Sequence, residues 1–457
     1  MKFINSMSKI SKNISVFSEK RLNKIAEEVG FIQRHSKIDG NMFFKIFTFG
    51  AFSVDNLSLR SLSDFYERID SSKEITRQGL ENRLKKGSDF LEKVFKNTIE
   101  EKYLKIQKMN NIRSLQLFSD IKICDSSIIP VNDELKLIWK GYGNSVPKAA
   151  LKLQTLYSFK YNSIENVELR CACENDAVYM NDLTKQINEN ELLLVDLGYF
   201  DKQYFNQILN KGAHFLSKAK SNTVFYKENL ITNKLEKFDL EGFLKKSINN
   251  QIDLYLYTKS KDNEFFEFRI IGEKLPEELY KEKLRRANQN ATNQGRTLSK
   301  KEKETLKWTI MLTSVDKEFA TVESLMQIYR IRWQIEILFK CWKSFGHIEK
   351  VKLAKKYYLK CLIYGRLIMC LLINCAYSNI KYIYKVFKNR DVSIIMFYST
   401  IANNLKDICI NFSTKKNDIE NILQILNRVA RKSLREKRRR KSSEEILFDY
   451  ALPPTLE

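Results

Sequence analysis

Residues 191–200 read ELLLVDLGYF, and this stretch decides how the surrounding chain is expected to fold. Four consecutive apolar residues, Leu192 to Val195, predict a strand that is buried on both faces of a sheet. Asp196 follows directly, and Gly198 then allows the chain to turn. An acidic residue in this position lies where sheets covered by helices place their chemistry, at the carboxyl end of a central strand.

A second acidic residue follows a candidate strand upstream, in the stretch LQLFSDIKICDSSIIPV of residues 115–131. Asp125 shares the odd-numbered face of the apolar residues Ile121 and Ile123. The segments KLQTLYSFKYN and ENVELRCACEN predict two more strands, and residues 181–190 predict a helix. This order predicts an α/β fold with a mixed sheet flanked by helices. Asp125 alone is weaker evidence, because such an Asp is often only a turn former or a helix cap.

The periodicity changes along the chain and predicts five segments. Helical periodicity runs through the first of them, whereas the strands DLYLYT and FFEFRIIGEKL mark a later insertion into the sheet domain. The predicted segments are an all-α domain (1–112), the first part of a sheet domain (113–225), a β-rich insertion (226–307), the second part of the sheet domain (308–380) and a helical C-terminal region with a basic tail (381–457). The motifs and the resemblance given below imply that the first segment binds DNA, that the sheet domain is catalytic and that the last segment serves dimerisation or DNA contact.

Two short helices in the first segment, residues 59–69 and 77–86, predict a helix-turn-helix-like pair, with Thr76 as the N-cap of the second. Arg77 and Arg83 would then face a DNA groove or its phosphates. The alternative is a solvated face on a helical bundle, and the segment alone does not decide between them.

The charge balance predicts a polyanionic partner. Lys and Arg number 79 against 55 Asp and Glu, which gives 79 − 55 = +24. Residues 428–441 hold nine Lys or Arg and one Glu, so 9 − 1 = +8 of that excess lies there. This run is expected to add nonspecific affinity for phosphates, and a solvated end is the alternative.

The eight cysteines are scattered through a long, apolar chain that needs no disulfides, which predicts the reducing cytoplasm. No charge-free apolar stretch of 18 residues occurs, and the nearest candidate, residues 367–377, predicts a buried helix. We therefore expect no membrane association.

Residues 321–345 predict one long helix that carries the third carboxylate, Glu336. Because successive residues of a helix are rotated by about 100° around its axis, this sequence forms a polar stripe and a separate apolar face. The stripe consists of Tyr329, Arg332, Glu336, Lys340 and Lys343, and the apolar face of Ile331, Ile335, Leu338 and Trp342. Ordinary i,i+4 salt links along a solvated helix are the alternative for the stripe.

Three carboxylates without Cys or His match what two-metal phosphoryl transfer needs. Two divalent ions roughly 3.5–4 Å apart, bridged by carboxylates, activate the attacking oxygen and stabilise the leaving one. Magnesium prefers such oxygen ligands and keeps several waters. We expect Asp125, Asp196 and Glu336 to meet, and the basic stripe residues to hold DNA phosphates beside the ions.

These residues resemble a known family. Tyr329-x2-Arg332-x3-Glu336-x6-Lys343 resembles the YREK signature of DDE transposases of the insertion sequence four type, and CDSS at Asp125 and VDLGYF at Asp196 resemble the first two acidic motifs. The intervals, 196 − 125 = 71 and 336 − 196 = 140, with a β-rich insertion in the second, are also similar to the family's.

The resemblance implies an RNase H-like catalytic fold and two Mg2+ or Mn2+ ions per active site, held by Asp125, Asp196 and Glu336. It also implies that Tyr329, Arg332, Lys340 and Lys343 contact the DNA of the transposon end. Trp308 resembles a tryptophan on which some relatives stack a flipped base during hairpin formation, and Trp333 is a second candidate. Core packing is the alternative for both tryptophans.

The implied function is transposition of a bacterial insertion sequence by cleavage at the element ends and strand transfer into target DNA, in a cut-and-paste reaction. A homodimer on two double-stranded DNA ends, in the cytoplasm and associated with the nucleoid, is the expected assembly. Two rivals stay open: an RNase H-like DNA nuclease without strand transfer, and an inactive DNA-binding regulator.

Overall fold

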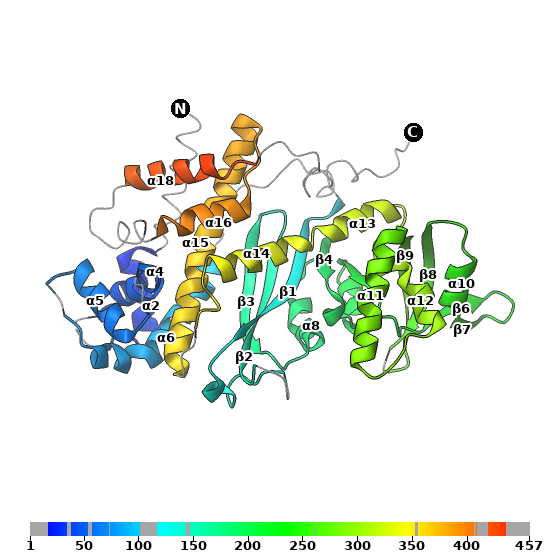
Figure 1. Cartoon of the computed structure of the whole chain (residues 1–457), viewed down its shortest axis with the longest axis horizontal. Coiled ribbons are helices and arrows are strands. Elements are labelled where there is room, and N and C mark those ends of the chain that lie inside the picture. The colour runs from blue at the N-terminus through cyan, green and yellow to red at the C-terminus, as the bar shows by residue number, and fades with distance from the viewer. Residues whose placement is uncertain are drawn as a thin grey trace. The chain divides into compact units, whose positions relative to one another are not determined.

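The computed structural model describes residues 17–33, 38–53, 57–72, 74–100, 117–142, 147–260, 262–351, 355–405, 408 and 419–435 of the chain (Figure 1). The chain divides into two compact units, each built from separate stretches of sequence. Unit 1 comprises Met1–Met109, Ser126–Glu174 and Gln334–Arg439, and unit 2 comprises Asn110–Asp125, Asn175–Trp333 and Arg440–Glu457. Part of the basic run, residues 436–441, lies outside the described residues.

Unit 2 is built on a sheet whose first strands are parallel. The strands in sheet order are β1 (Asp120–Pro130), β4 (Glu191–Val195), β5 (His214–Lys218), β10 (Trp308–Thr313), β9 (Phe265–Lys274), β8 (Gln251–Lys259), β6 (Phe225–Asn229) and β7 (Lys234–Phe238). β1, β4 and β5 run parallel, and every later pair is antiparallel. All of β4 is buried, as its apolar run predicts, because covered parallel strands bury both faces.

Helices flank this sheet in unit 2. They are α8 (Asp176–Lys185), the 3-10 turn η5 (Leu197–Tyr199), α9 (Lys202–Asn210), α10 (Leu240–Lys246), α11 (Glu277–Asn293), α12 (Lys300–Leu306) and α13 (Val322–Arg330). The helix predicted at 181–190 begins five residues earlier, because the Asn175 side chain accepts a hydrogen bond from the Ala177 N–H and caps α8 there.

Unit 1 combines helices with the strands β2 (Ala150–Ser158) and β3 (Ser163–Cys171), which pair antiparallel and lie on the other side of β1 in the strand order. The helices are α2 (Glu19–Glu28), α3 (Gly40–Lys45), the π-helix η2 (Ile46–Gly50), α4 (Ala51–Ser53), α5 (Leu59–Ile69), α6 (Arg77–Glu100), the 3-10 turn η4 (Asp133–Leu135), α14 (Trp333–Ser344), α15 (Lys356–Lys388), α16 (Ile394–Ala402) and α18 (Ile419–Lys432). The predicted mixed α/β class, a large sheet flanked by helices, is confirmed.

Helix α15 forms the core of unit 1. It has 33 residues and is apolar enough to cross a membrane by length and composition, but 89% of its most apolar window is buried inside the protein. Leu367 and Tyr377, the ends of the predicted buried segment, are 1% and 3% exposed. A largely buried apolar helix of this kind is the core helix of a domain, and the expectation of a buried helix is confirmed.

The single helix predicted for residues 321–345 is wrong, because a turn at Ile331 and Arg332 separates α13 from α14. At the turn, the N–H groups of Ile331 and Arg332 donate to carbonyls three residues back, at 3.0 and 3.1 Å, instead of four. No Gly or Pro marks this position in the sequence, so local propensity gave no signal for the interruption. The four residues of the predicted apolar face are nevertheless all buried.

Candidate active site

The first two acidic residues lie side by side because of the register of β1 and β4. Cys124 pairs with Val195 at the end of this parallel ladder. Asp125 and Asp196 are the next residue on each strand, and neighbouring strands lie about 5 Å apart. Two carboxylates that are 71 residues apart in the chain therefore lie next to each other where the pairing of β1 with β4 ends. β1 itself continues to Pro130, so Asp125 ends the pairing with β4 and not the strand.

Asp196 is held by the turn that follows it. Its Oδ1 accepts a hydrogen bond of 2.7 Å from the Gly198 N–H, and the side chain thereby caps the 3-10 turn η5. A Cβ at Gly198 would approach the Asp176 Oδ2 to 3.1 Å, which is tighter than ordinary van der Waals contact. The Asp-x-Gly sequence therefore fixes the orientation of the carboxylate.

Arg332 binds Asp125 directly. Its Nη1 lies 2.8 Å from Asp125 Oδ2, and the two side chains are only 13% and 17% exposed. The guanidinium also lies against the Tyr329 ring, 5.9 Å from its centroid. Charged hydrogen bonds of this length in a partly buried setting are among the strong ones, so Arg332 fixes the position of the carboxylate.

Tyr329 joins α13 to the carboxyl end of β4. Its hydroxyl donates to the Val195 carbonyl at 3.1 Å, and the residue is buried. Burial raises the pKa of Tyr329 to about 12, against the influence of Arg332, while Asp196 acts in the same direction as burial. The hydroxyl therefore remains a donor at neutral pH. Lys218, at the end of β5, lies above the same ring at 5.8 Å.

The structure thus brings together Asp125, Asp196, Tyr329 and Arg332, all in unit 2. Glu336, Lys340 and Lys343 lie on α14, in unit 1.

On α14, Glu336 is half-buried in the first turn and Lys340 is exposed. The Lys343 Nζ donates to the Ile128 carbonyl at 2.9 Å and lies 4.0 Å from Glu349. Lys343 therefore ties α14 to the end of β1 within unit 1. Its predicted contact with DNA, like that of Lys340, stays a prediction.

The two tryptophans differ sharply in exposure. Trp308 is 3% exposed and packs with Leu244 of α10 and Ile252 of β8 in a small apolar core. Trp333, the first residue of α14, is 59% exposed. Only Trp333 has a face available for stacking in this structure, and base contacts by either residue stay predictions.

The two N-terminal arginines lie on α6, which Thr76 caps as predicted, its Oγ1 accepting from the Gly79 N–H at 3.1 Å. Arg77 is exposed. Arg83 donates to the Phe31 carbonyl at 3.4 Å and lies over the Phe31 ring at 5.7 Å. Arg83 therefore helps to hold this helix in unit 1, and DNA contact by both arginines stays a prediction.

The carboxylate pair is chemically suited to a hard divalent cation, because adjacent Asp side chains present oxygen ligands of the kind that Mg2+ and Mn2+ take. In the part of the chain that the structure describes, no group of three His, Cys, Asp or Glu side chains forms a metal site. The carboxylates that the strand register brings together are therefore the pair Asp125 and Asp196.

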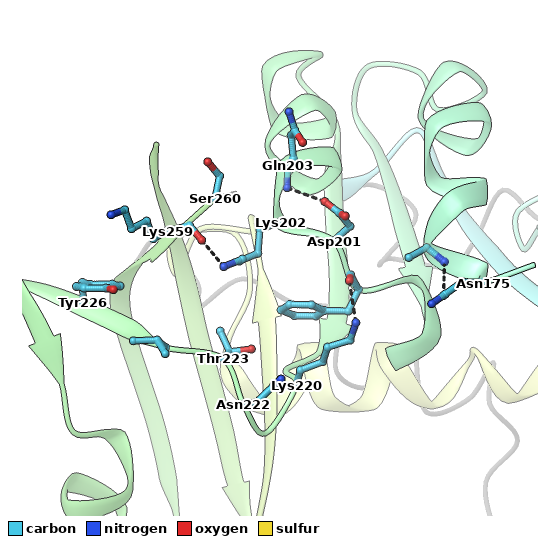
Figure 2. A pocket seen from close by; sticks show the side chains of 13 residues that line it. Asn175, Asp201, Lys202, Gln203, Lys220, Asn222, Thr223, Tyr226, Lys259 and Ser260 are labelled. Carbon is cyan, nitrogen blue, oxygen red and sulfur yellow. Dashed lines mark hydrogen bonds between the residues drawn. The ribbon is translucent and has the colours of Figure 1, made fainter. Parts of the chain in front are cut away.

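Sequence reasoning missed a basic hollow in unit 2, close in the chain to Asp196. A pocket of about 520 Å3 lies between the start of α9, the segment after β5, the start of β6 and the end of β8 (Figure 2). Lys202, Lys220 and Lys259 line it. Lys202 in the FDK sequence after the second acidic motif is a local sign of this basic pocket. The rest of its lining lies next to β5 and β6, and no local pattern predicts these two strands.

Comparison with known proteins identifies a matching family and similar transposases. Residues 116–373 match the family described as Transposase DDE domain, which is 373 − 116 + 1 = 258 of the 457 residues. The chain is 28% identical to the transposase for insertion sequence element IS1151 of Clostridium perfringens, over 86% of this chain and 85% of that one. It is 25% identical to the transposase for insertion sequence element IS231D of Bacillus thuringiensis subsp. finitimus, over 94% and 91%.

Among solved structures, the cryo-EM structure of the piggyBac transposase synaptic complex with hairpin DNA aligns with a TM-score of 0.47. The two chains are 12% identical, and the alignment covers 95% of this chain and 87% of that one.

Proposed function

This chain belongs to the DDE transposases of the insertion sequence four type, and from that membership we propose that Asp125, Asp196 and Glu336 form its catalytic centre. The protein is a DNA transposase. The observation that carries the proposal is the pairing of Cys124 with Val195, which places the two aspartates side by side. Glu336 enters as the third carboxylate by its place in the YREK pattern.

We further propose that the catalytic domain is RNase H-like. The strand order β3-β2-β1-β4-β5, with β2 and β3 antiparallel and β1, β4 and β5 parallel, supports this. Asp125 and Asp196 lie at the carboxyl end of the parallel pairing between β1 and β4, which is where sheets covered by helices place their chemistry.

The proposed reaction begins with attack of water on a phosphodiester at the element end. The new phosphorus–oxygen bond forms as the bond to the 3′-oxygen breaks, which leaves a 5′-phosphate and a free 3′-hydroxyl. That hydroxyl then attacks a phosphodiester of the target DNA, or of the opposite strand where a hairpin forms, and the 3′-oxygen of the attacked linkage leaves as a new 3′-hydroxyl. Both steps are in-line displacements at phosphorus, so one site serves both in turn.

The residues of the proposed catalytic centre have different roles in this reaction. Asp125, Asp196 and Glu336 would hold Mg2+ or Mn2+, and the bound ions supply Lewis-acid stabilisation of the attacking and leaving oxygens. Arg332 orients Asp125 and can bind a DNA phosphate with the same planar set of N–H donors. Tyr329 is a positioning residue, because its hydroxyl fixes α13 against the strand that carries Asp196.

The expected partners are the two transposon ends and the target DNA, all double-stranded. We propose that two protomers act in one complex, because two ends must be joined to one target. The place of action is the cytoplasm, with the protein bound to chromosomal DNA.

The first experiment replaces both aspartates of the pair. Asp125→Asn with Asp196→Asn keeps the side-chain volumes but removes the two negative charges that hold the cation. We expect strand cleavage at the element end to fall below detection in Mg2+, while binding to the same DNA is retained. Asp182→Asn, on α8, is the matched control, because this half-buried aspartate binds the exposed Lys185 and lies outside the aspartate pair.

Gel assays of labelled element-end DNA with a target plasmid measure both outcomes and separate the rivals. Cleavage without joined products would favour the nuclease, and binding without cleavage by the wild type would favour the regulator. Cleavage by the double Asn variant at the wild-type rate would remove the aspartates from the mechanism.

A further inference from the structure

The pocket that follows the second acidic motif is not part of the proposed catalytic centre. Figure 2 shows Lys202 reaching from α9 towards Lys259, with Thr223 and Tyr226 on the side of β6. The lining side chains are otherwise neutral and polar, apart from two rings, two small apolar residues and Asp201. A hollow of this composition does not suit an apolar ligand.

The three lysines make the pocket positive. Lys202 donates to the main-chain carbonyl of Lys259, and Lys220 donates to the Phe200 carbonyl at 3.2 Å. Within the described residues, none of the three ammonium groups has a carboxylate within ion-pair distance. Each bonded ammonium still has N–H donors beyond the one that it gives to a carbonyl.

The single acidic lining residue offsets only part of this charge, because one carboxylate faces three ammonium groups. Asp201 Oδ1 accepts from the N–H groups of Gln203 and Tyr204, at 3.0 and 3.5 Å, and caps α9. Burial lowers the pKa of Lys202, and Asp201 only partly opposes this. Half-buried cations without a counter-charge are costly, and an anion with several acceptor oxygens relieves that cost.

The short distance along the chain between the pocket and Asp196 indicates which anion would bind in the pocket. Phe200 follows Asp196 by four residues, a stretch of chain that spans at most about 14 Å. An anion in the pocket therefore lies within a few nucleotides of a strand held at the aspartate pair. With a net charge of +24 on the chain, the abundant anion in this position is a DNA phosphate.

We propose that this hollow, the Lys202–Lys220 pocket, binds one phosphate group of the DNA on which the transposase acts. Lys202 and Lys220 direct N–H donors at the phosphate oxygens, and the Lys259 side chain adds charge at the rim. The inference rests on the proposed function only in that the ligand is DNA. The phosphate is either an internal phosphodiester or a 5′-terminal phosphate, and both present the same oxygens.

The test combines Lys202→Gln and Lys220→Gln with neutral linkages in the DNA. Fluorescence anisotropy, without divalent metal, measures binding of an element-end duplex in which single phosphates are replaced in turn by methylphosphonates, and of a duplex that lacks its 5′-phosphates. We expect one replacement to weaken wild-type binding about tenfold, as loss of a charged hydrogen bond does. The same replacement should leave the double variant unaffected.

Two further variants make the result specific. Lys259→Gln removes a rim charge but leaves the main-chain carbonyl that Lys202 uses, so it should show a smaller loss at the same linkage. Lys227→Gln changes an exposed lysine of β6 outside the pocket and should behave as the wild type. Sensitivity at an internal linkage identifies a phosphodiester, and sensitivity to 5′-dephosphorylation identifies a terminal phosphate.

The outcomes also separate this proposal from the catalytic one. If the Lys202 and Lys220 variant keeps the full wild-type pattern of sensitivity, the pocket does not bind phosphate, whatever the cleavage assay gives. If wild-type binding is indifferent to every phosphate and to salt, the DNA-binding function itself fails.

Discussion

At the scale of single residues, electrostatics near the aspartate pair depends on lysines that the sequence did not single out. Lys283, on α11, donates to the Trp308 carbonyl at 2.8 Å. Burial, with a smaller contribution from Lys218, lowers the pKa of Lys283 to about 8. Lys218 in turn lies over Tyr329. Lys283 of α11 and Lys218 of β5 are therefore two cations close to each other, and Lys218 also contacts the tyrosine that binds the Val195 carbonyl.

Replacement of Lys283 by Met should stabilise the protein at neutral pH. The folded-state pKa lies below the unfolded value of about 10.4, so the folded chain binds fewer protons between these values. The cost of burying the cation is thus fully present below about pH 8 and disappears towards pH 10. We expect the advantage of Lys283→Met, on the order of 1–3 kcal/mol at pH 7, to shrink across that range.

Urea unfolding at several pH values measures this difference. Lys281→Met on the same helix changes an exposed lysine and should show little pH dependence relative to the wild type. A difference for Lys283→Met that is constant from pH 7 to pH 10 would contradict the depressed pKa.

At the scale of elements, close packing of helices fixes the N-terminal part of unit 1. α6 and α15 pack against each other, and Lys360 on α15 binds Glu92 on α6 at 3.0 Å. Two glycines permit the close approach of α3 and η2 to these helices. A Cβ at Gly87 would overlap the Phe43 ring, and a Cβ at Gly365 would overlap the Phe47 carbonyl. The predicted N-terminal helices thus share a core with α15.

Gly365→Ala should destabilise unit 1, because its Cβ meets main-chain atoms of η2 that cannot rotate away. We expect a loss of at least about 1–3 kcal/mol in unfolding free energy, the usual cost of overpacking. Val386→Ala on the exposed end of the same helix is the control, with an expected change within about 0.5 kcal/mol. Thermal unfolding followed by circular dichroism compares the two, and equal midpoints would show that α15 does not pack this closely.

At the scale of the whole molecule, the excess positive charge and the transposase family both point to assembly on DNA. The proposed reaction joins two element ends, and each protomer would supply the proposed site with Asp125 and Asp196 for one of them. Size-exclusion chromatography with light scattering on element-end DNA should give a complex of two protomers and two duplexes. A mass of one protomer per duplex at all concentrations would contradict the proposed dimer.

The sequence predicted much of the fold because its strongest signals are local. Periodicity and composition predict the apolar run of β4, the strands β2, β3, β8 and β9, and the buried segment of α15. The short strand β5 was missed, and so was the turn between α13 and α14. The turn carries no glycine or proline, and β5, although Gly212 with its positive φ precedes it, has only five residues, too few for a clear period.

The sequence by itself determined the family and predicted Asp125 and Asp196 as acidic site residues, because the motifs around each aspartate are local patterns. Only the tertiary structure decided the partners of these residues: Arg332 binds Asp125 across 207 positions, and Tyr329 binds Val195 across 134. The basic pocket likewise combines segments around residues 202, 220 and 259. Contacts between distant segments follow from strand register and helix packing, which no local pattern encodes.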